Sequence, residues 1–190
     1  YLATSFDAYE DGEIQLNEEP FWVGDQVPPQ KAKWENGRLV FFESDGTALS
    51  FRIADTEFNS RGSQEYQIKA KGMGFYVENN SQEDVTLDLF MPGFSDKGNA
   101  CYGFSADTEV ELISVDGEVI AGELGSDNSV YIPAGFKGYV NFDLETLQNA
   151  WGGGTPWAPE SVPITLVGFT FRYLYLEEGE TFVIDNLYLY

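Results

Sequence analysis

The sequence predicts an all-β protein, folded as a two-sheet jelly-roll β-sandwich with one short helix. Apolar and polar residues alternate with a period of two along most of the 190 residues, and no long stretch has the spacing of an amphipathic helix. The alternating runs are short and are separated by Asn-Gly and Asp-Gly pairs, which favour tight hairpin turns. A chain of this length without long helices favours a jelly roll over an immunoglobulin fold. A chain of this length fits one domain, which we expect to span residues 1–190.

The strands and turns follow from this pattern in chain order. Strands are predicted over residues 38–43, 48–53, 66–71, 73–78, 85–91, 109–115, 129–132, 139–142, 164–176 and 181–190. Hairpin turns are predicted at 35–38, 44–47 and 115–118, each with a glycine that accepts a positive φ angle.

One helix and one strand irregularity are also expected. Asp143 is a suitable N-cap, so a short helix is predicted to follow it and to end near Gln148. In the last strand, an interruption of the alternation at Asp185-Asn186 would let the apolar residues on both sides of it face the core. These apolar residues are Phe182, Ile184, Leu187 and Leu189.

The charge and residue content exclude several functions. The chain has 32 acidic and 10 basic residues, a net charge of −22 that repels nucleic acid and anionic membranes. It has no histidine, which removes the Ser-His-Asp triad and histidine-ligated zinc. A carboxylate glycosidase would need an acidic pair flanking a cleft, and Glu109-Val110-Glu111 is the nearest approach to the alternating acids of sandwich glucanases. We therefore expect no enzymatic activity.

The single cysteine and the first residues of the sequence indicate the kind of protein to which this domain belongs. Cys101 has no partner for a disulfide, and we expect it to be a buried apolar residue. The sequence begins at Tyr1 without a methionine and has no apolar run long enough to span a membrane. These features favour a module of a longer, extracellular bacterial chain.

Four segments together resemble a known class of module. They are Ser5-Phe6-Asp7, Gly74-Phe75-Tyr76-Val77-Glu78-Asn79, Tyr131-Ile132-Pro133-Ala134-Gly135-Phe136-Lys137-Gly138-Tyr139-Val140 and Phe182-Val183-Ile184-Asp185-Asn186-Leu187. The chain resembles the jelly-roll carbohydrate-binding modules of secreted bacterial polysaccharide-degrading, cellulosome-like proteins. This resemblance implies a sandwich without catalysis that holds a polymer near an attached enzyme. In such modules the sugar lies either across a concave sheet face or on aromatic residues in loops at one edge.

The four tryptophans are the first candidates for sugar platforms. Trp151 and Trp157 lie around three glycines in the loop 149–160, and an indole ring stacks well on the apolar face of a pyranose. The alternative is that one of the two folds back as a lid over the core. Trp22 and Trp34 flank a proline-containing connection and are further candidates, with a purely structural role as the alternative.

A sheet face is the second candidate for a sugar site. The alternation places Phe75 and Val77 towards the core, and the side chains between them point to the other face. The same reasoning suggests that one face is lined by Tyr76, Asp88, Tyr139, Asn141 and Arg172. An ordinary solvated sheet face has a similar composition, which is the alternative.

The resemblance also implies a structural calcium ion between the first and last strands. Asp7 and Asp185 occupy positions where the resemblance places carboxylate ligands, and Glu10 or Asp143 are candidates to join them. The spacing after Asp7 also matches part of an EF-hand loop, but its third position is Tyr9 and the flanks are not helical. Solvated surface carboxylates are the alternative.

These observations predict a non-catalytic module for a neutral plant or storage polysaccharide such as β-glucan, xyloglucan, mannan or starch. The alternative is a structural or adhesion domain whose aromatic loop docks on a protein partner.

Overall fold

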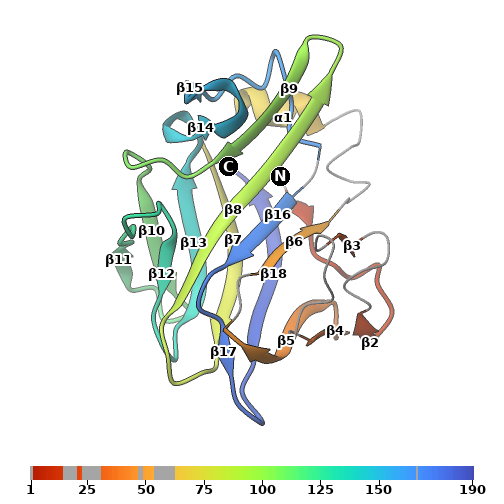
Figure 1. Cartoon of the computed structure of the whole chain (residues 1–190), viewed down its shortest axis with the longest axis vertical. Helices are drawn as coiled ribbons and strands as arrows, with labels where there is room; N and C mark the ends of the chain where they lie inside the picture. The colour runs from red at the N-terminus through yellow and green to blue at the C-terminus, as the bar shows by residue number, and fades with distance from the viewer. Residues whose placement is uncertain (1, 15–20, 23–30, 47–48, 54–62, 166) are drawn as a thin grey trace.

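Two antiparallel β-sheets pack face to face in the computed structural model of the chain (Figure 1). The structure describes residues 2–14, 21–22, 31–46, 49–53, 63–165 and 167–190. Within these residues, ten strands form one sheet, here called the large sheet, and eight strands form the other, the small sheet. The predicted all-β sandwich is therefore confirmed.

The large sheet has the strand order β11-β10-β13-β7-β18-β5-β4-β2, with β1 added to β18 and β17 added to β5. Its strands are β1 Leu2–Thr4, β2 Gly12–Ile14, β4 Lys31–Glu35, β5 Arg38–Asp45, β7 Gly72–Asn79, β10 Val110–Ser114, β11 Val119–Ala121, β13 Lys137–Asp143, β17 Tyr175–Leu176 and β18 Phe182–Leu189.

The small sheet has the order β15-β14-β9-β8-β16-β6-β3, with β12 added to β8. Its strands are β3 Phe21–Trp22, β6 Leu49–Ile53, β8 Val85–Ser95, β9 Gly98–Gly103, β12 Val130–Ile132, β14 Gln148–Asn149, β15 Thr155–Pro156 and β16 Val167–Phe171. In Figure 1, β8, β9, β16 and β6 lie in front of β13, β7 and β18.

Aromatic side chains from both sheets meet in the core. Phe75 of β7 contacts Phe169 of β16 at a centroid distance of 5.7 Å, and Phe41 of β5 contacts Phe171 of β16 at 4.9 Å. These rings are fully buried, and each buried side chain of this size stabilises the fold by about 1.5 to 3 kcal/mol. The core thus fixes which face of each strand remains for function.

Two of the three predicted hairpins are present. At 35–38, Asn36 and Gly37 have φ angles of 52° and 71°, as a two-residue hairpin turn with positive φ at both central positions requires. At 115–118, β10 turns into β11, with Ile113 opposite Val119.

The third predicted hairpin, at 44–47, is wrong. β5 ends at Asp45 in the large sheet and β6 lies in the small sheet, so the chain crosses between sheets here. The end of β5 pairs instead with β17, which places Tyr175 opposite Asp45. Gly46 has a φ of 82°, and a Cβ atom there would overlap the Tyr175 ring.

The short helix lies elsewhere than predicted. Asp143 does accept a hydrogen bond from the Glu145 backbone N–H, but it caps only the 3-10 turn η1, Leu144–Thr146, because the chain then enters β14. Within the described residues the one α-helix is α1, Ser63–Lys69, where a strand was predicted over 66–71. The amide of Gln67 is buried and exchanges two hydrogen bonds with the backbone of Ile164, so tertiary contacts hold the helix against the sheets.

The remaining expectations about the fold hold in part. The register of β18 shifts between Asp185 and Tyr188, and apolar residues on both sides of the shift are buried, as predicted. The predicted strand 164–176 is divided between β16 and β17. Cys101 is buried. Among the helices that the structure describes, none has the length and apolarity of a membrane span.

Candidate functional site

A pocket of about 380 Å³ opens on the outer face of the small sheet. Its walls come from β8, β9, the loop after β9 and the segment that carries β14 and the second 3-10 turn η2, Ala150–Gly152. Its polar and aromatic lining includes Asp88, Phe90, Asp107, Asn128 and Gln148.

The alternation along β8 selects which side chains reach this face. Leu87 and Leu89 are buried in the core, so Asp88 and Phe90 point the other way. Phe94, further along the strand, is 49% exposed. Sequence reasoning identified Asp88 but missed both phenylalanines, although continuing the same period would have found Phe90. Phe94 was missed because β8 continues through Pro92-Gly93 to Ser95 and was predicted to end at Met91.

Asp88 carries an oxygen whose hydrogen-bonding capacity is not used. The backbone N–H groups of Leu89 and Phe104 hydrogen-bond to its carboxylate, but within the described residues its buried Oδ1 has no hydrogen-bond partner. Burial raises the pKa of Asp88 to about 7, against the opposing effect of these N–H groups. A buried acceptor without a partner costs about 1 to 3 kcal/mol, so a hydroxyl group reaching Asp88 would recover part of that cost.

An ion pair between Arg172 and Asp127 lies near Asp88. Arg172 Nε lies 3.2 Å from Asp127 Oδ2, and β16 places Thr170 directly opposite Asp88. The positive charge of Arg172 lowers the pKa of Asp88 and the negative charge of Asp127 raises it. Asp88 and Arg172, both predicted to line a sugar-binding sheet face, therefore lie in one electrostatic environment.

An aromatic ridge, formed by Phe90, Phe94 and Trp151, borders the pocket. The Trp151 ring lies 6.0 Å from each phenylalanine ring, with interplanar angles of 71° to Phe90 and 50° to Phe94. Trp151 is 49% exposed. The ridge is thus an exposed stacking surface next to a polar pocket.

The loop that carries Trp151 is held by one side chain. Asn149 Oδ1 accepts hydrogen bonds from the backbone N–H of Trp151 at 3.1 Å and of Cys101 at 2.9 Å. Gly153 then takes a φ of 69°, which ends the turn in the left-handed region.

Trp157 lies outside the ridge. Its ring packs edge-on against the buried Tyr102 at 4.6 Å and contacts the core. Its backbone N–H donates to the Leu147 carbonyl. This packing fits the alternative interpretation, in which one of the loop tryptophans covers the core.

Trp34 and Trp22 do not add to the ridge. Trp34 is only 7% exposed, and its ring stacks on Tyr9 at 4.2 Å with an interplanar angle of 12°. A sugar platform needs an accessible ring face, so the prediction of such a platform at Trp34 is at odds with its burial. Trp22 belongs to β3, but its side chain lies outside what the structure describes, and its role stays a prediction.

The five residues predicted to line one sheet face lie on two. Asp88 and Arg172 lie on the outer face of the small sheet, whereas Tyr76, Tyr139 and Asn141 lie on the outer face of the large sheet. The prediction of one common face is wrong because alternation separates inward from outward positions but does not assign a strand to a sheet.

The four predicted calcium ligands do not converge. Burial raises the pKa of Asp185 to about 6, and the negative charge of Asp7 adds a smaller increase, so the two carboxylates interact electrostatically. Asp143 caps η1. It pairs with Gly72 of β7, whereas Asp185 pairs with Tyr76, so the two positions are four residues, or about 13 Å, apart along β7. Glu10 is exposed.

These positions do not fit a calcium site built from all four side chains. In the part of the chain that the structure describes, no three acidic or cysteine side chains are placed to hold a metal ion. A calcium ion held by Asp7, Asp185 and further oxygens stays a prediction.

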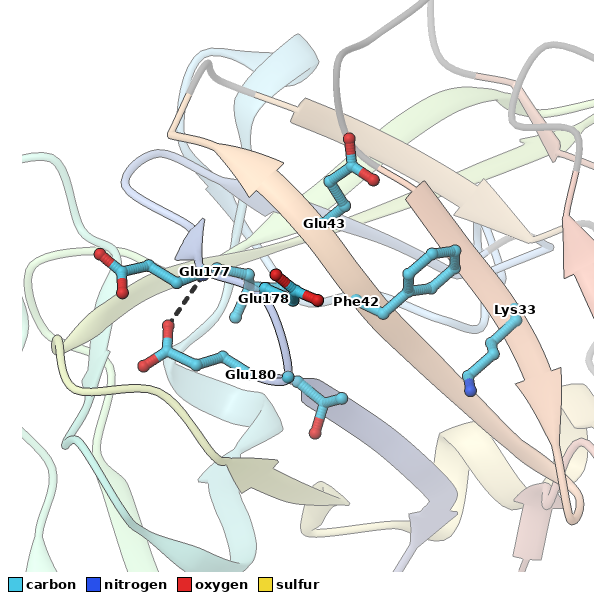
Figure 2. Close-up of a pocket in the computed structure, with 9 residues that line it drawn as sticks. Lys33, Phe42, Glu43, Glu177, Glu178 and Glu180 are labelled. Carbon is cyan, nitrogen blue, oxygen red and sulfur yellow. Dashed lines mark hydrogen bonds between the residues drawn. The ribbon is translucent and has the colours of Figure 1, made fainter.

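A separate pocket of about 490 Å³ surrounds Phe42 (Figure 2). Lys33 Nζ lies 5.7 Å from the centroid of the Phe42 ring, and Glu43 pairs with Lys31 at 2.9 Å. Glu180 accepts a hydrogen bond from the Glu177 backbone N–H, drawn as the dashed line. Lys33, Glu43 and Glu180 of this pocket are thus already engaged with neighbouring residues, which separates it from the pocket at Asp88.

The comparisons with known proteins gave distant structural similarities only. No protein-family model matches the sequence, and no curated protein matches it. Among solved structures, the chain is similar to a family 11 carbohydrate-binding module from Clostridium thermocellum in complex with a β-1,3-1,4-mixed-linked tetrasaccharide, with a TM-score of 0.41 and 10% identity. That similarity covers 99% of this chain and 93% of that chain.

Two further structures show similarity at the same level. The family 11 module of the cellulosomal cellulase Lic26A-Cel5E of Clostridium thermocellum has a TM-score of 0.39 and 10% identity, over 100% of this chain and 92% of that chain. The structure of PfGH50B has a TM-score of 0.42 and 11% identity, over 95% of this chain and 23% of that chain. At these scores the similarities assign neither a ligand nor site residues to this chain.

Proposed function

We propose that this chain is a non-catalytic carbohydrate-binding module that holds a neutral polysaccharide on the outer face of the small sheet. The observation that carries the proposal is the aromatic ridge of Phe90, Phe94 and Trp151 beside a pocket that contains Asp88. Stacking surface and unmet hydrogen-bonding capacity occur together there.

The chemistry of a pyranose matches this pair of features. Its C–H face is apolar and gains from contact with an indole ring such as that of Trp151. Its hydroxyl groups both donate and accept hydrogen bonds, so they can pair with Asp88 whether its carboxyl group is ionised or protonated. Asn128 and Gln148, which also line the pocket, add amide donors and acceptors.

The charge of the site favours a neutral polymer over an acidic one. Asp107 and Asp127 place negative charge around the pocket, and Arg172 is paired with Asp127. A uronic acid would meet like charges here, which opposes its binding. We therefore propose β-glucan, xyloglucan, mannan or starch as the ligand class. We also propose that this module belongs to a secreted chain with further modules.

The absence of catalysis is part of the proposal. The sequence contains no histidine, so no imidazole is present to act as a general acid or base. The aromatic ridge and the pocket supply binding and orientation, which is what a targeting module requires.

Affinity electrophoresis tests the proposal. The purified chain is run through native gels that contain mixed-linked β-glucan, xyloglucan, galactomannan, xylan, pectin or starch, alongside Trp151→Ala and the matched control Tyr66→Ala. Tyr66 is an exposed aromatic residue on α1 that does not line the pocket. We expect retardation of the wild type and the control in a neutral polymer, and weaker retardation of Trp151→Ala.

Two results would contradict this reading. Equal retardation of all three proteins would place the glycan away from the aromatic ridge. No retardation in any gel would favour the alternative, in which the ridge docks on a protein.

A further inference from the structure

The outer face of the large sheet carries a second aromatic surface, on the opposite side of the core from the pocket. It consists of four tyrosines, Tyr76, Tyr139, Tyr188 and Tyr190, here called the tyrosine strip. Neighbouring rings are 5.3 Å apart between Tyr76 and Tyr139, 5.9 Å between Tyr139 and Tyr188, and 6.0 Å between Tyr188 and Tyr190. The strip thus crosses β7, β13 and β18.

Two rings of the strip are exposed, and the other two are held in place by hydrogen bonds. Tyr139 is 36% exposed and Tyr190 is 53% exposed, while the other two are half-buried. Tyr76 donates a hydrogen bond to Glu78, and Tyr188 donates one to Asn141. A ring held in this way loses little conformational freedom when a ligand stacks on it.

A pocket of about 460 Å³ lies on this same face, next to Tyr76. Arg38, Glu78 and Asn80 are among its polar lining residues, and the Arg38 guanidinium carbon lies 5.7 Å from the centroid of the Tyr76 ring. This arrangement, stacking rings beside directed donors and acceptors, is the combination that sugar sites use.

The charges of this face select the class of ligand. Arg38 Nη1 lies 3.1 Å from Glu78 Oε1, and Lys137 Nζ lies 3.7 Å from Glu78 Oε2. Arg38 also lies 3.8 Å from Asp185. Both cations are compensated within the face, so an anionic ligand finds no unpaired positive charge, whereas a neutral polyhydroxylated chain needs none.

We propose that the tyrosine strip and its adjoining pocket form a second binding surface for a neutral glycan chain. The ligand class rests on the proposed function of the small-sheet face. Because the two surfaces lie on opposite faces of the sandwich, a single polymer segment cannot lie across both at once. The two surfaces therefore hold separate segments, either of one long chain or of two chains.

Isothermal titration with a soluble neutral oligosaccharide, chosen from the polymer that retards the protein, tests this second surface. The proteins are the wild type, Trp151→Ala, Tyr139→Ala and the double variant, with Tyr66→Ala as the matched control. Circular dichroism melting of each variant establishes that it is folded. We expect about two oligosaccharides per wild-type molecule, about one for each single variant and none for the double variant.

Polymer binding extends the test, because two-site attachment strengthens binding to a long chain. We expect each single variant to bind the polymer roughly tenfold or more weakly than the wild type. The wild type, but neither single variant, should cross-link the soluble polymer and raise its light scattering.

The outcomes separate the two proposals. One oligosaccharide per wild-type molecule, with binding abolished by Trp151→Ala and unaffected by Tyr139→Ala, would overturn the second surface and leave the first intact. Binding abolished by Tyr139→Ala and unaffected by Trp151→Ala would support the large-sheet surface and overturn the small-sheet site. If no polymer retarded the wild-type protein, both proposed surfaces would be overturned.

Discussion

The outer faces of the two sheets arise from the same alternation of residues but differ in how their polar groups are satisfied. On the large sheet, the Glu78 carboxylate is engaged by four neighbours, which are Tyr76, Asn80, Arg38 and Lys137. On the small sheet, Asp88 lies in a pocket with one buried oxygen that the described residues leave without a hydrogen bond. Two surfaces of similar composition therefore differ in how much hydrogen-bonding capacity they keep for a ligand.

The largest effect is expected from a tryptophan that faces inward. Trp34→Ala removes a buried indole from the contact with Phe6 and Tyr9 and should lower the free energy of unfolding by about 3 kcal/mol or more. Urea denaturation followed by circular dichroism measures this loss. Glycan affinity of the folded fraction should stay near the wild-type value, and a selective loss of affinity would show that Trp34 contacts the ligand.

The next effect is a change of the unfolding free energy with pH that arises from Asp88. The pKa of Asp88 is about 7 in the folded protein and about 3.9 in an unfolded chain, so the folded state holds the proton more tightly. The stability that this proton contributes is complete below about pH 4 and is lost as the pH rises through about 7. Relative to Asp88→Asn, the wild type should lose about 2 to 4 kcal/mol of unfolding free energy over this range.

A series of denaturation curves between pH 4 and 8 measures this difference. Asp185→Asn is the matched variant on the large sheet, where the pKa of Asp185 is about 6. The difference in unfolding free energy between Asp185→Asn and the wild type should change with pH in the same direction, and it should level off at a lower pH. If the unfolding free energies of the wild type and of Asp88→Asn changed in parallel with pH, this would show that Asp88 is not buried as described.

A smaller effect is expected on binding at the aromatic ridge. Trp151→Ala should weaken glycan binding by about 1 to 3 kcal/mol, the usual loss when an aromatic contact residue is truncated. Its melting temperature should stay close to that of the wild type, because Trp151 is exposed and its loop is held through backbone groups. A large drop in melting temperature with unchanged affinity would identify Trp151 as a structural residue.

The smallest effect concerns calcium. Because only Asp7 and Asp185 lie together among the predicted ligands, we expect added calcium to raise the melting temperature by no more than a few degrees. Asp7→Asn should remove this rise, and EDTA should reverse it in the wild type. Identical melting curves with calcium and with EDTA would contradict the predicted ion.

Sequence reasoning was most reliable where local geometry decides the structure. The register shift in β18 follows from the need to bury Ile184 and Leu187 on the same side, and Asn36-Gly37 forms the predicted turn because both residues tolerate positive φ. The turn at Asp45-Gly46 has the same local pattern but connects different sheets, because its surroundings are set by the distant Tyr175.

The proposed binding site could be predicted only in part from the sequence, for the same reason. Trp151 and Asp88 were identified by residue type and alternation, but their proximity depends on the pairing of β8, β9 and β14. Trp34 and Trp151 are the same residue type. The packing of Phe6 and Tyr9 against Trp34 is what distinguishes the buried ring from the exposed one. Long-range packing therefore decided which aromatic residues were left for a ligand.

The side chain of Asn149 has a kinetic consequence. By fastening the backbone at Cys101 and Trp151, it sets the platform in place before any sugar arrives, so association need not wait for a loop to order. Glycans of different affinity should then differ mainly in how fast they leave, while their association rates remain similar. Asn149→Ala would convert this preorganised platform into one that must be assembled at each encounter, which slows association.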